Sequence, residues 1–344
     1  MVRLLDVKAL SKLVHTHGLE AILQDIITKL REDFSRWDDF QIIPRPAFHV
    51  KDGVIELMPV CDSKYFAFKC VNGHPKNPSI GRQTVVATGQ LLNVSDGYPI
   101  LMSEMTMVTA MRTAGVSALA TDLLARKDST KLAIIGTGAQ SEYQTIANKL
   151  VRDIKEVRYF DTDPKAMAKY HANMSSNLAG AKLNLIPCAD TREAIKGADI
   201  IIVCTADKTN AEILKYEWLE EGQHINGLGG DCPGKTELEG KIVQNSKVVV
   251  EFFEQAFIEG EIQKFTEAEA REIVDAELHE VVNGKAIREN DSEITVFDGV
   301  GIAMEDYSGL CVINELAEKY SIGDKHEMVP DIADPKDLFG ELLK

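Results

Sequence analysis

The sequence predicts an α/β protein in which a doubly wound parallel sheet follows a smaller α+β domain. Three observations predict this class. A glycine turn over residues 136–141 follows an apolar run and opens a helical pattern. Strand and helix patterns alternate after that turn, as expected for a parallel sheet with helical crossovers. A chain of 344 residues, 44% hydrophobic and 27% charged, is globular and too long for one ordinary core.

The glycine turn has the features of a nucleotide-binding βα turn. The run 132–135 reads as a strand, the turn is Gly136-Thr137-Gly138-Ala139-Gln140, and Ser141 starts a helix. Glycines let the backbone turn tightly and approach a pyrophosphate, and the helix N-terminus offers unpaired N–H groups. Ser141 stands where the strict pattern has its third glycine, so slightly looser packing of helix on strand is expected. The alternative is an ordinary glycine-rich turn.

A second strand pattern supports the nucleotide interpretation. Residues 157–160 end in Asp161, which stands 25 residues after Gly136 (161 − 136). A carboxylate at this place accepts hydrogen bonds from an adenosine ribose and repels a 2′-phosphate. The sequence therefore predicts a Rossmann-type domain that binds NAD in preference to NADP.

The nucleotide domain is predicted over residues 127–320. Further apolar runs separated by helical stretches predict additional parallel strands, and a helix over residues 303–320 follows the last of them. The expected strands are residues 183–186, 200–204, 224–228, 247–250 and 293–297.

The α+β domain is predicted over residues 1–126, with the tail 321–344 packing back on it. Apolar residues at helical spacing over 4–34 predict two helices joined near His17-Gly18. A helix rich in small residues over 104–126 leads into the second domain. The expected strands are residues 54–58, 65–69, 84–88 and 90–94, with a hairpin bend over 93–99.

Charge and cysteine usage exclude several kinds of function. A net charge of −16 repels nucleic acid and anionic membranes, so small-molecule partners are expected. The six cysteines include no C-x-x-C pair, and the histidines lack metal-ligand spacing, so no metal is expected and the cysteines read as reduced thiols of a cytoplasmic protein. No apolar stretch is long enough for a signal sequence or a bilayer span.

Ligands of open α/β sheets lie beyond the carboxyl ends of the strands, and three such ends stand out. The first carries Asp231 just after a glycine-rich strand end, where a carboxylate faces the nicotinamide and acts on a substrate amine or water. The alternative is a turn aspartate that caps the next helix. Thr205 follows the second, and the third is the glycine-rich segment 297–301.

Cations at otherwise apolar positions of the first domain point to an anionic ligand. Arg45 lies between two prolines, Lys69 ends a strand pattern, and Arg112 sits on the small-residue helix. Together the three suit an α-carboxylate through bidentate and point-charge contacts. Singly, each is better explained as a solvated or salt-bridged residue. Glu56, between Ile55 and Leu57, can face either side of its strand.

Three segments make the sequence resemble the ornithine cyclodeaminase and mu-crystallin family from about Asp6 to Phe339. They are Phe68-Lys69-Cys70-Val71-Asn72-Gly73-His74-Pro75, residues 136–141 and Gly229-Gly230-Asp231-Cys232-Pro233-Gly234-Lys235-Thr236-Glu237-Leu238. Two departures concern specificity: Cys70 replaces an expected aromatic residue, and the loop 78–83 is unlike that of the nearest relative.

The resemblance implies roles for individual residues. The implied catalytic residues are Asp231 as acid/base, Lys69, and Glu56 near the side-chain amine. The implied substrate-binding residues are Arg45, Lys69, Arg112 and Val296. The implied cofactor-binding residues are Thr84, Arg112, Gly136, Gly138, Ala139, Gln140, Asp161, Thr205, Asn226, Gly227, Leu228 and Lys235.

The resemblance also implies a reaction, in which NAD takes a hydride from Cα of L-ornithine and returns it after ring closure, giving L-proline and ammonia. It implies a homodimer formed through the first domain. An amino-acid or opine dehydrogenase, a ketimine reductase and a lysine cyclodeaminase remain alternatives. A ligand-binding protein of the crystallin kind is the non-enzyme alternative, against which Asp231 and the three cations argue.

Overall fold

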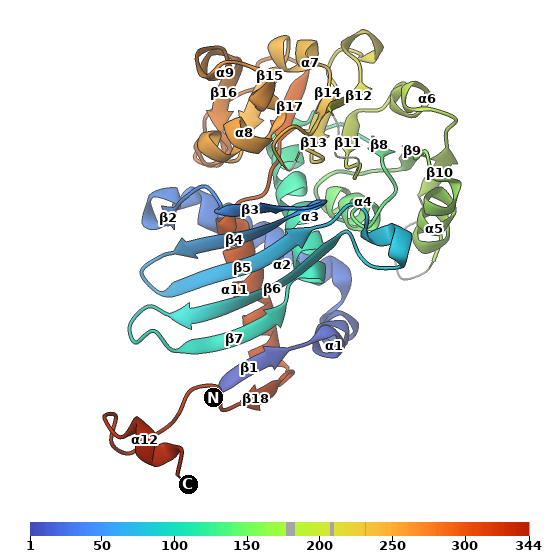
Figure 1. Cartoon of the computed structure of the whole chain (residues 1–344). Helices are drawn as coiled ribbons and strands as arrows, with labels where there is room; N and C mark the ends of the chain where they lie inside the picture. Colours follow the sequence, from blue (N-terminus) through green and yellow to red (C-terminus); the bar gives the residue numbers. More distant parts are fainter. Residues whose placement is uncertain (177–182, 207–209, 231, 344) are drawn as a thin grey trace.

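The computed structural model describes residues 1–176, 183–206, 210–230 and 232–343. Figure 1 shows two sheets, one above the other, with α3 (Thr106–Leu124) running between them. This is the helix expected over 104–126, and it packs on α2 (Leu19–Ser35) and α4 (Ser141–Val151). Its small residues permit this approach, because a Cβ at Gly115 would lie 2.8 Å from Ile26 Cγ2.

The first sheet has the strand order β18-β1-β7-β6-β5-β4-β2, and β3 pairs with β4. All of its pairs are antiparallel except β1 with β7. The strands are β1 (Val2–Leu5), β2 (Gln41–Ile42), β3 (Ala47–Val50), β4 (Gly53–Cys61), β5 (Tyr65–Gly73), β6 (Val85–Asn93), β7 (Pro99–Glu104) and β18 (Asp324–His326).

Three sequence expectations for this region were wrong. Lys69, expected to end its strand, lies in the middle of β5, because the ladder with β4 and β6 continues to Gly73. The runs 84–88 and 90–94 form one strand, β6, which continues through Gly89 because that glycine packs closely rather than turning: a Cβ there would lie 2.9 Å from Met105 Cγ. Residues 4 and 5, read as helical, belong to β1. The helix α1 (Val7–His17) begins only after Asp6, whose carboxylate accepts from the N–H of Ala9 at 2.8 Å. The break at Gly18 is confirmed, with φ +92°.

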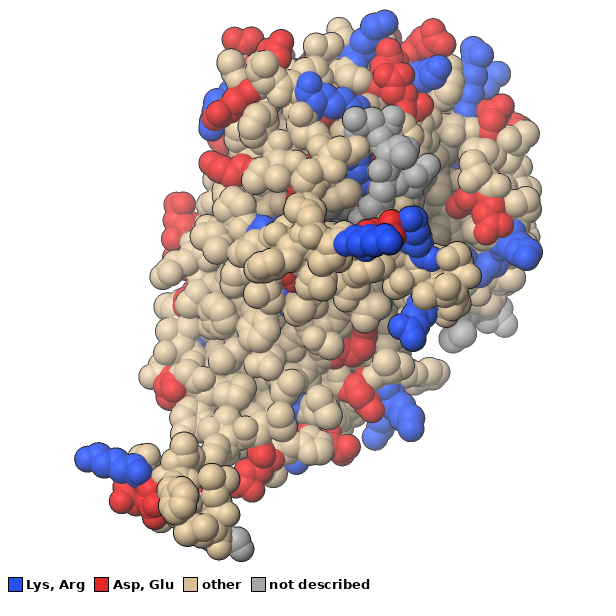
Figure 2. Space-filling model, in the orientation of Figure 1, with Lys and Arg blue, Asp and Glu red and all other residues tan. Residues whose placement is uncertain are grey.

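One face of the first sheet is covered by helices and the other is open. Along β4, residues 54, 56, 58 and 60 are buried, whereas Ile55 and Leu57 are 39% and 41% exposed. On the same open face Phe48 and Val86 are 63% and 41% exposed. Figure 2 shows a broad area over this sheet with few charged side chains. An open apolar face of this kind is a candidate interface.

The second sheet confirms the predicted doubly wound topology. Its order is β10-β9-β8-β11-β13-β17-β15-β16, and every pair is parallel. The chain reverses its direction across the sheet between β8 and β11, which is where such sheets bind ligands. The strands are β8 (Lys131–Ile135), β9 (Glu156–Phe160), β10 (Asn184–Pro187), β11 (Ile200–Val203), β13 (His224–Gly227), β15 (Lys247–Val250), β16 (Val274–Glu277) and β17 (Thr295–Asp298).

Helices cover this sheet, and a separate two-stranded sheet lies beside its carboxyl edge. The helices are α4, α5 (Pro164–Met174), α6 (Thr191–Ile195), α7 (Gly240–Gln244), α8 (Phe253–Glu259), α9 (Glu267–Ile273) and α10 (Leu278–Val282). The small sheet pairs β12 (Asn210–Leu214) with β14 (Thr236–Leu238).

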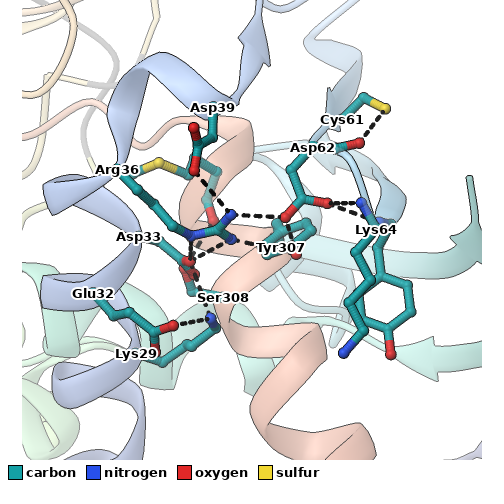
Figure 3. Close-up of polar contacts among 12 residues, drawn as sticks. Lys29, Glu32, Asp33, Arg36, Asp39, Cys61, Asp62, Lys64, Tyr307 and Ser308 are labelled. Carbon is teal, nitrogen blue, oxygen red and sulfur yellow. Dashed lines mark hydrogen bonds and ion pairs between the residues drawn. The ribbon is translucent and has the colours of Figure 1, made fainter.

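The helix α11 (Ala303–Lys319) follows β17 but packs against β4, β5 and β6 of the first sheet. Figure 3 shows how polar contacts anchor it: the Tyr307 hydroxyl donates to Asp62 at 2.7 Å, and the Ser308 hydroxyl donates to Asp33 at 2.7 Å. Arg36 bonds both of these aspartates. The domain division at residue 320 stays a prediction, and from this packing we propose that α11 belongs with the first domain.

The C-terminal tail returns to the first sheet through β18, which pairs with β1. Beyond it, α12 (Leu338–Glu341) lies away from the body of the molecule, near the lower edge of Figure 1. Across the described residues, no helix combines the length and the apolar character that crossing a membrane requires.

Candidate active site

The glycine turn lies at the carboxyl end of β8, beside β11. Gly136 has φ +94°, and a Cβ there would lie 2.9 Å from the Cys204 carbonyl oxygen, so backbone from two strand ends meets at this glycine. A Cβ at Gly138 would meet nothing within 4 Å, so open space lies beside it. The Ser141 hydroxyl donates to the Gly138 carbonyl at 2.9 Å as α4 begins. This open N-terminus suits a pyrophosphate.

Asp161 follows β9 and lies across the glycine turn, as the sequence predicts. Its Oδ2 accepts from the backbone N–H of Thr137 at 2.6 Å and from the Thr137 hydroxyl at 3.2 Å. Gln140 holds a buried Oε1 that has no hydrogen-bond partner among the described residues, and Ala139 is exposed. The carboxylate, the unpaired amide oxygen and the open glycine together fit an adenosine diphosphate group.

The carboxyl ends of β11 and β13 bring the next predicted residues together. Leu228 donates its N–H to the Val203 carbonyl at 2.9 Å, which holds the two strand ends side by side. Gly227 accepts from the N–H of Gly299 at 2.9 Å. Asn226 is fully buried, and its side chain points to α3, donating to the Thr121 hydroxyl at 2.9 Å.

Thr205 and Lys235 meet at the same edge. The Lys235 ammonium donates to the Thr205 carbonyl at 3.1 Å, and Glu237 accepts from both the N–H and the hydroxyl of Thr205. Asp231, expected as the acid/base residue, lies outside the described residues. Its neighbours in the chain, Gly230 and Cys232, are buried.

Lys69 and Arg112 share one carboxylate. The Lys69 ammonium lies 2.8 Å from Asp306, and Arg112 Nε lies 3.0 Å from the same side chain. Arg112 also pairs with Glu305. Burial lowers the pKa of Lys69 to about 8, against the opposing effect of Asp306. The two cations are fixed side by side by α11, a geometry suited to a substrate carboxylate.

Arg45 lies between the two domains. Its Nε is 3.0 Å from Glu56 Oε1, its Nη2 pairs with Glu259, and its Nη1 donates to the carbonyls of Val300 and Gly301, each at 3.2 Å. Glu56 therefore faces the helix-covered side of its strand, which decides the question that alternation left open. All three guanidinium nitrogens of Arg45 therefore have a partner.

A further buried acid completes the cluster. Glu251, after β15, accepts from the N–H groups of Val300 and Gly301 at 3.1 and 2.6 Å. Burial, and next the charge of Glu305, raise the pKa of Glu251 well above its usual range. Burial and the neighbouring charge of Glu305 therefore favour the neutral form of the Glu251 carboxyl group.

The charges of this cluster do not balance. Among the described residues, three cations and five carboxylates lie together here, Arg45 with a side chain 7% exposed and the other seven buried, which gives a formal charge of 3 − 5 = −2. The members are Arg45, Lys69, Arg112, Glu56, Glu251, Glu259, Glu305 and Asp306. A ligand with one carboxylate and two ammonium groups is complementary to such a cluster, whereas a ligand with two carboxylates is not.

Two predicted residues are not brought to this cluster. Val296 is fully buried within β17, between Ile225 and Val248 of the neighbouring strands. Thr84 lies just before β6, where its carbonyl accepts from the N–H of His74 at 2.7 Å. Both roles stay predictions that no described contact supports.

The sequence reasoning missed the acids that hold the cations. Glu305 and Asp306 stand in an otherwise mostly apolar helix, and Glu251 directly follows three valines. Charged residues are rarely fully buried unless they are paired, so acids in such apolar contexts were a usable signal.

Comparison with known proteins identifies the family of this chain. The model of the ornithine cyclodeaminase/mu-crystallin family matches residues 7–321. The ornithine cyclodeaminase of Agrobacterium fabrum is 45% identical over 344 residues, which is 100% of this chain and 95% of the relative. An alanine dehydrogenase of Archaeoglobus fulgidus is 34% identical over 83% of this chain and 87% of its own length.

Two solved structures share the whole fold. The Thermococcus litoralis Δ1-pyrroline-2-carboxylate reductase, in complex with NADH and L-proline, has a TM-score of 0.86 at 31% identity and covers 94% of this chain and 100% of its own. A lysine cyclodeaminase that recognises L-lysine, L-ornithine and L-2,4-diaminobutyric acid has a TM-score of 0.90 at 27% identity, covering 98% of both chains. The chain therefore belongs to the ornithine cyclodeaminase/mu-crystallin family.

Proposed function

We propose that this chain is a cytoplasmic, NAD-dependent cyclodeaminase that converts L-ornithine to L-proline with release of ammonia. Relatives named ornithine cyclodeaminase are 42–45% identical over its full length. The observation that carries the proposal is the buried cluster with more carboxylates than cations, because L-ornithine brings two ammonium groups and one carboxylate to it.

The cofactor fits the switch point of the second sheet. The glycine turn and the start of α4 would hold the pyrophosphate, and Asp161 would hold the adenosine ribose. When bound, the cofactor would supply a hydride acceptor for Cα as NAD⁺ and, after ring closure, a hydride donor as NADH. The carboxylate of Asp161 favours NAD⁺ because it repels a 2′-phosphate.

The cations would orient the substrate. Lys69 and Arg112, fixed by Asp306, offer a point charge and a planar guanidinium to the α-carboxylate. Arg45 would contribute from the other side, provided that the substrate carboxylate takes over part of the contact that Glu56 or Glu259 makes here. Holding the α-carboxylate fixes Cα relative to the cofactor site.

Acidic residues would manage protons and the side-chain amine. An alkyl ammonium has a pKa near ~10, so the δ-amine must give up a proton before it adds to the α-imine carbon left by hydride removal, after which ammonia leaves and a cyclic ketimine remains to accept the hydride. We assign the acid/base role to Asp231, and Glu56 would hold the δ-ammonium end of the substrate. Ring closure is favoured because both reacting atoms belong to one bound molecule.

The protein would act as a homodimer. The open face of the first sheet exposes Phe48, Ile55, Leu57 and Val86, and two copies facing each other would bury these side chains. A related archaeal alanine dehydrogenase, 30% identical, is a dimer. The substrate-binding domain, predicted over 1–126 and 321–344, would then also be the dimerisation domain.

The test follows the hydride. L-ornithine deuterated at Cα, incubated with catalytic NAD⁺, should give proline that retains the deuterium, ammonia in equal amount and no steady rise in NADH. A dehydrogenase would instead form NADH in proportion to ammonia and release an unlabelled product. That outcome would overturn the proposal. Parallel incubations with L-lysine and L-alanine determine whether the acidic cluster selects L-ornithine.

A further inference from the structure

Thr205 lies at the switch point of the second sheet, directly against the glycine turn. It follows β11 by two residues, and its Cα would lie 3.1 Å from a Cβ placed on Gly136. The backbone of Thr205 therefore lies directly against the first glycine of the nucleotide turn. Any shift of Thr205 would change the space that this glycine leaves for a cofactor.

Each polar group of Thr205 is held by the segment that follows Asp231 in the chain. Glu237 Oε1 accepts from the Thr205 N–H at 3.0 Å and from its hydroxyl, and Lys235 donates to its carbonyl at 3.1 Å. Glu237 and Lys235 are 1% and 2% exposed. Hydrogen bonds of buried charged groups are stronger than neutral ones, so this is a firm attachment.

The backbone of Glu237 is held in place by a second set of hydrogen bonds. Its backbone N–H donates to Glu261 Oε1 at 2.6 Å, and the N–H of Glu261 donates to Asp298 Oδ2 at 2.8 Å. On the other side, a Cβ added to Gly229 would fall on the Glu237 carboxylate. Because Gly229 has no side chain, the Glu237 carboxylate can lie directly against it. The segment just after β13 therefore also contacts this carboxylate.

We propose that Glu237 is a positioning residue for the cofactor site, which holds Thr205 against the glycine turn and joins residues 235–237 to the strand ends beside that turn. The inference rests on the proposed use of NAD. It assigns a role to Gly229 as well, which is to leave room for the Glu237 side chain.

The experiment measures NADH affinity by fluorescence titration of the purified full chain without substrate. Glu237→Ala should weaken NADH binding about tenfold or more, the scale of a lost hydrogen bond to a charged group. Glu237→Gln keeps an oxygen that can accept both Thr205 hydrogen bonds and should bind NADH within about threefold of the wild type. Glu239→Ala, which removes a carboxylate two residues further on, serves as the matched control and should leave the affinity unchanged.

Gly229→Ala gives an independent test. Its methyl group would push the Glu237 carboxylate off Thr205 and should weaken NADH binding as Glu237→Ala does. In the double variant the methyl group enters vacated space, so the two losses should not add. Fully additive losses, or wild-type affinity in Glu237→Ala, would overturn the inference. Absence of NADH binding by the wild type would instead overturn the proposed function, so the two failures are distinguishable.

Discussion

Asp298, the last residue of β17, offers a sharp test of the buried acidic network. Its side chain is 0% exposed, and Oδ2 accepts from the N–H groups of Glu261 and Ile262 at 2.8 and 3.3 Å. Burial, and next the charge of Glu261, raise the pKa of Asp298 to about 7. Asp298→Asn keeps an oxygen that can accept the same hydrogen bonds and removes the charge.

The sign and size of the effect follow from the two pKa values. An unfolded aspartate titrates near ~3.9, so between about pH 4 and 7 the folded state binds more protons than the unfolded state. Stability therefore falls as pH rises through this window, by about 4 kcal/mol in total for Asp298. Between pH 5 and pH 8 the wild type should lose about 3 kcal/mol relative to Asp298→Asn, because most of the titration lies in that range.

Denaturant unfolding at pH 5, 6, 7 and 8, followed by circular dichroism, measures this difference. The variant should gain stability relative to the wild type as pH rises and level off above pH 7 to 8. Asp128→Asn, at a side chain 85% exposed, controls for the removal of one acidic charge. Parallel stability curves for Asp298→Asn and the wild type over this range would refute the assignment of a raised pKa to Asp298.

Three other outcomes are expected. Burial lowers the pKa of Lys69 to about 8, so the ammonium that holds the substrate carboxylate should be lost above that pH. The value of kcat/KM for L-ornithine should then fall about tenfold per pH unit, and a flat profile to pH 10 would contradict this. Asp161→Ser should raise affinity for NADP⁺ by about tenfold in calorimetry, and unchanged selectivity would remove Asp161 from the ribose site. Leu57→Lys, on the open sheet face, should give monomers in sedimentation at micromolar concentration, whereas Lys at the exposed Val7 should not; dimers of Leu57→Lys would place the interface elsewhere.

The second sheet was predictable from the sequence because its signals are local. Parallel strands covered on both faces read as continuous apolar runs, and residues 200–203 are all isoleucine or valine and fully buried. The first sheet was less predictable from the sequence. β1 pairs with β18, more than 300 residues away, and the residues near Leu4 carry no signal of that pairing. The apolar residues around Leu4 instead have helical spacing, which predicts a helix.

The cations of the site were predictable, but their partners were not. Lys69 and Arg112 stand out as charged residues in apolar surroundings. Asp306, which holds both, lies 237 residues after Lys69, so only the tertiary fold joins them. The direction of Glu56 likewise depended on which face of the first sheet the helices cover, which alternation along one strand cannot decide.

The segment from β17 to the first turn of α11 joins the two halves of the site. Asp298, at its start, supports Glu261 and thereby Glu237 beneath the cofactor site, and Asp306, eight residues later (306 − 298), holds Lys69 and Arg112. Between them, the carbonyls of Val300 and Gly301 accept from Arg45. One short stretch of backbone therefore contacts both the residues of the proposed cofactor site and those of the proposed substrate cluster, so a change in this segment should affect both.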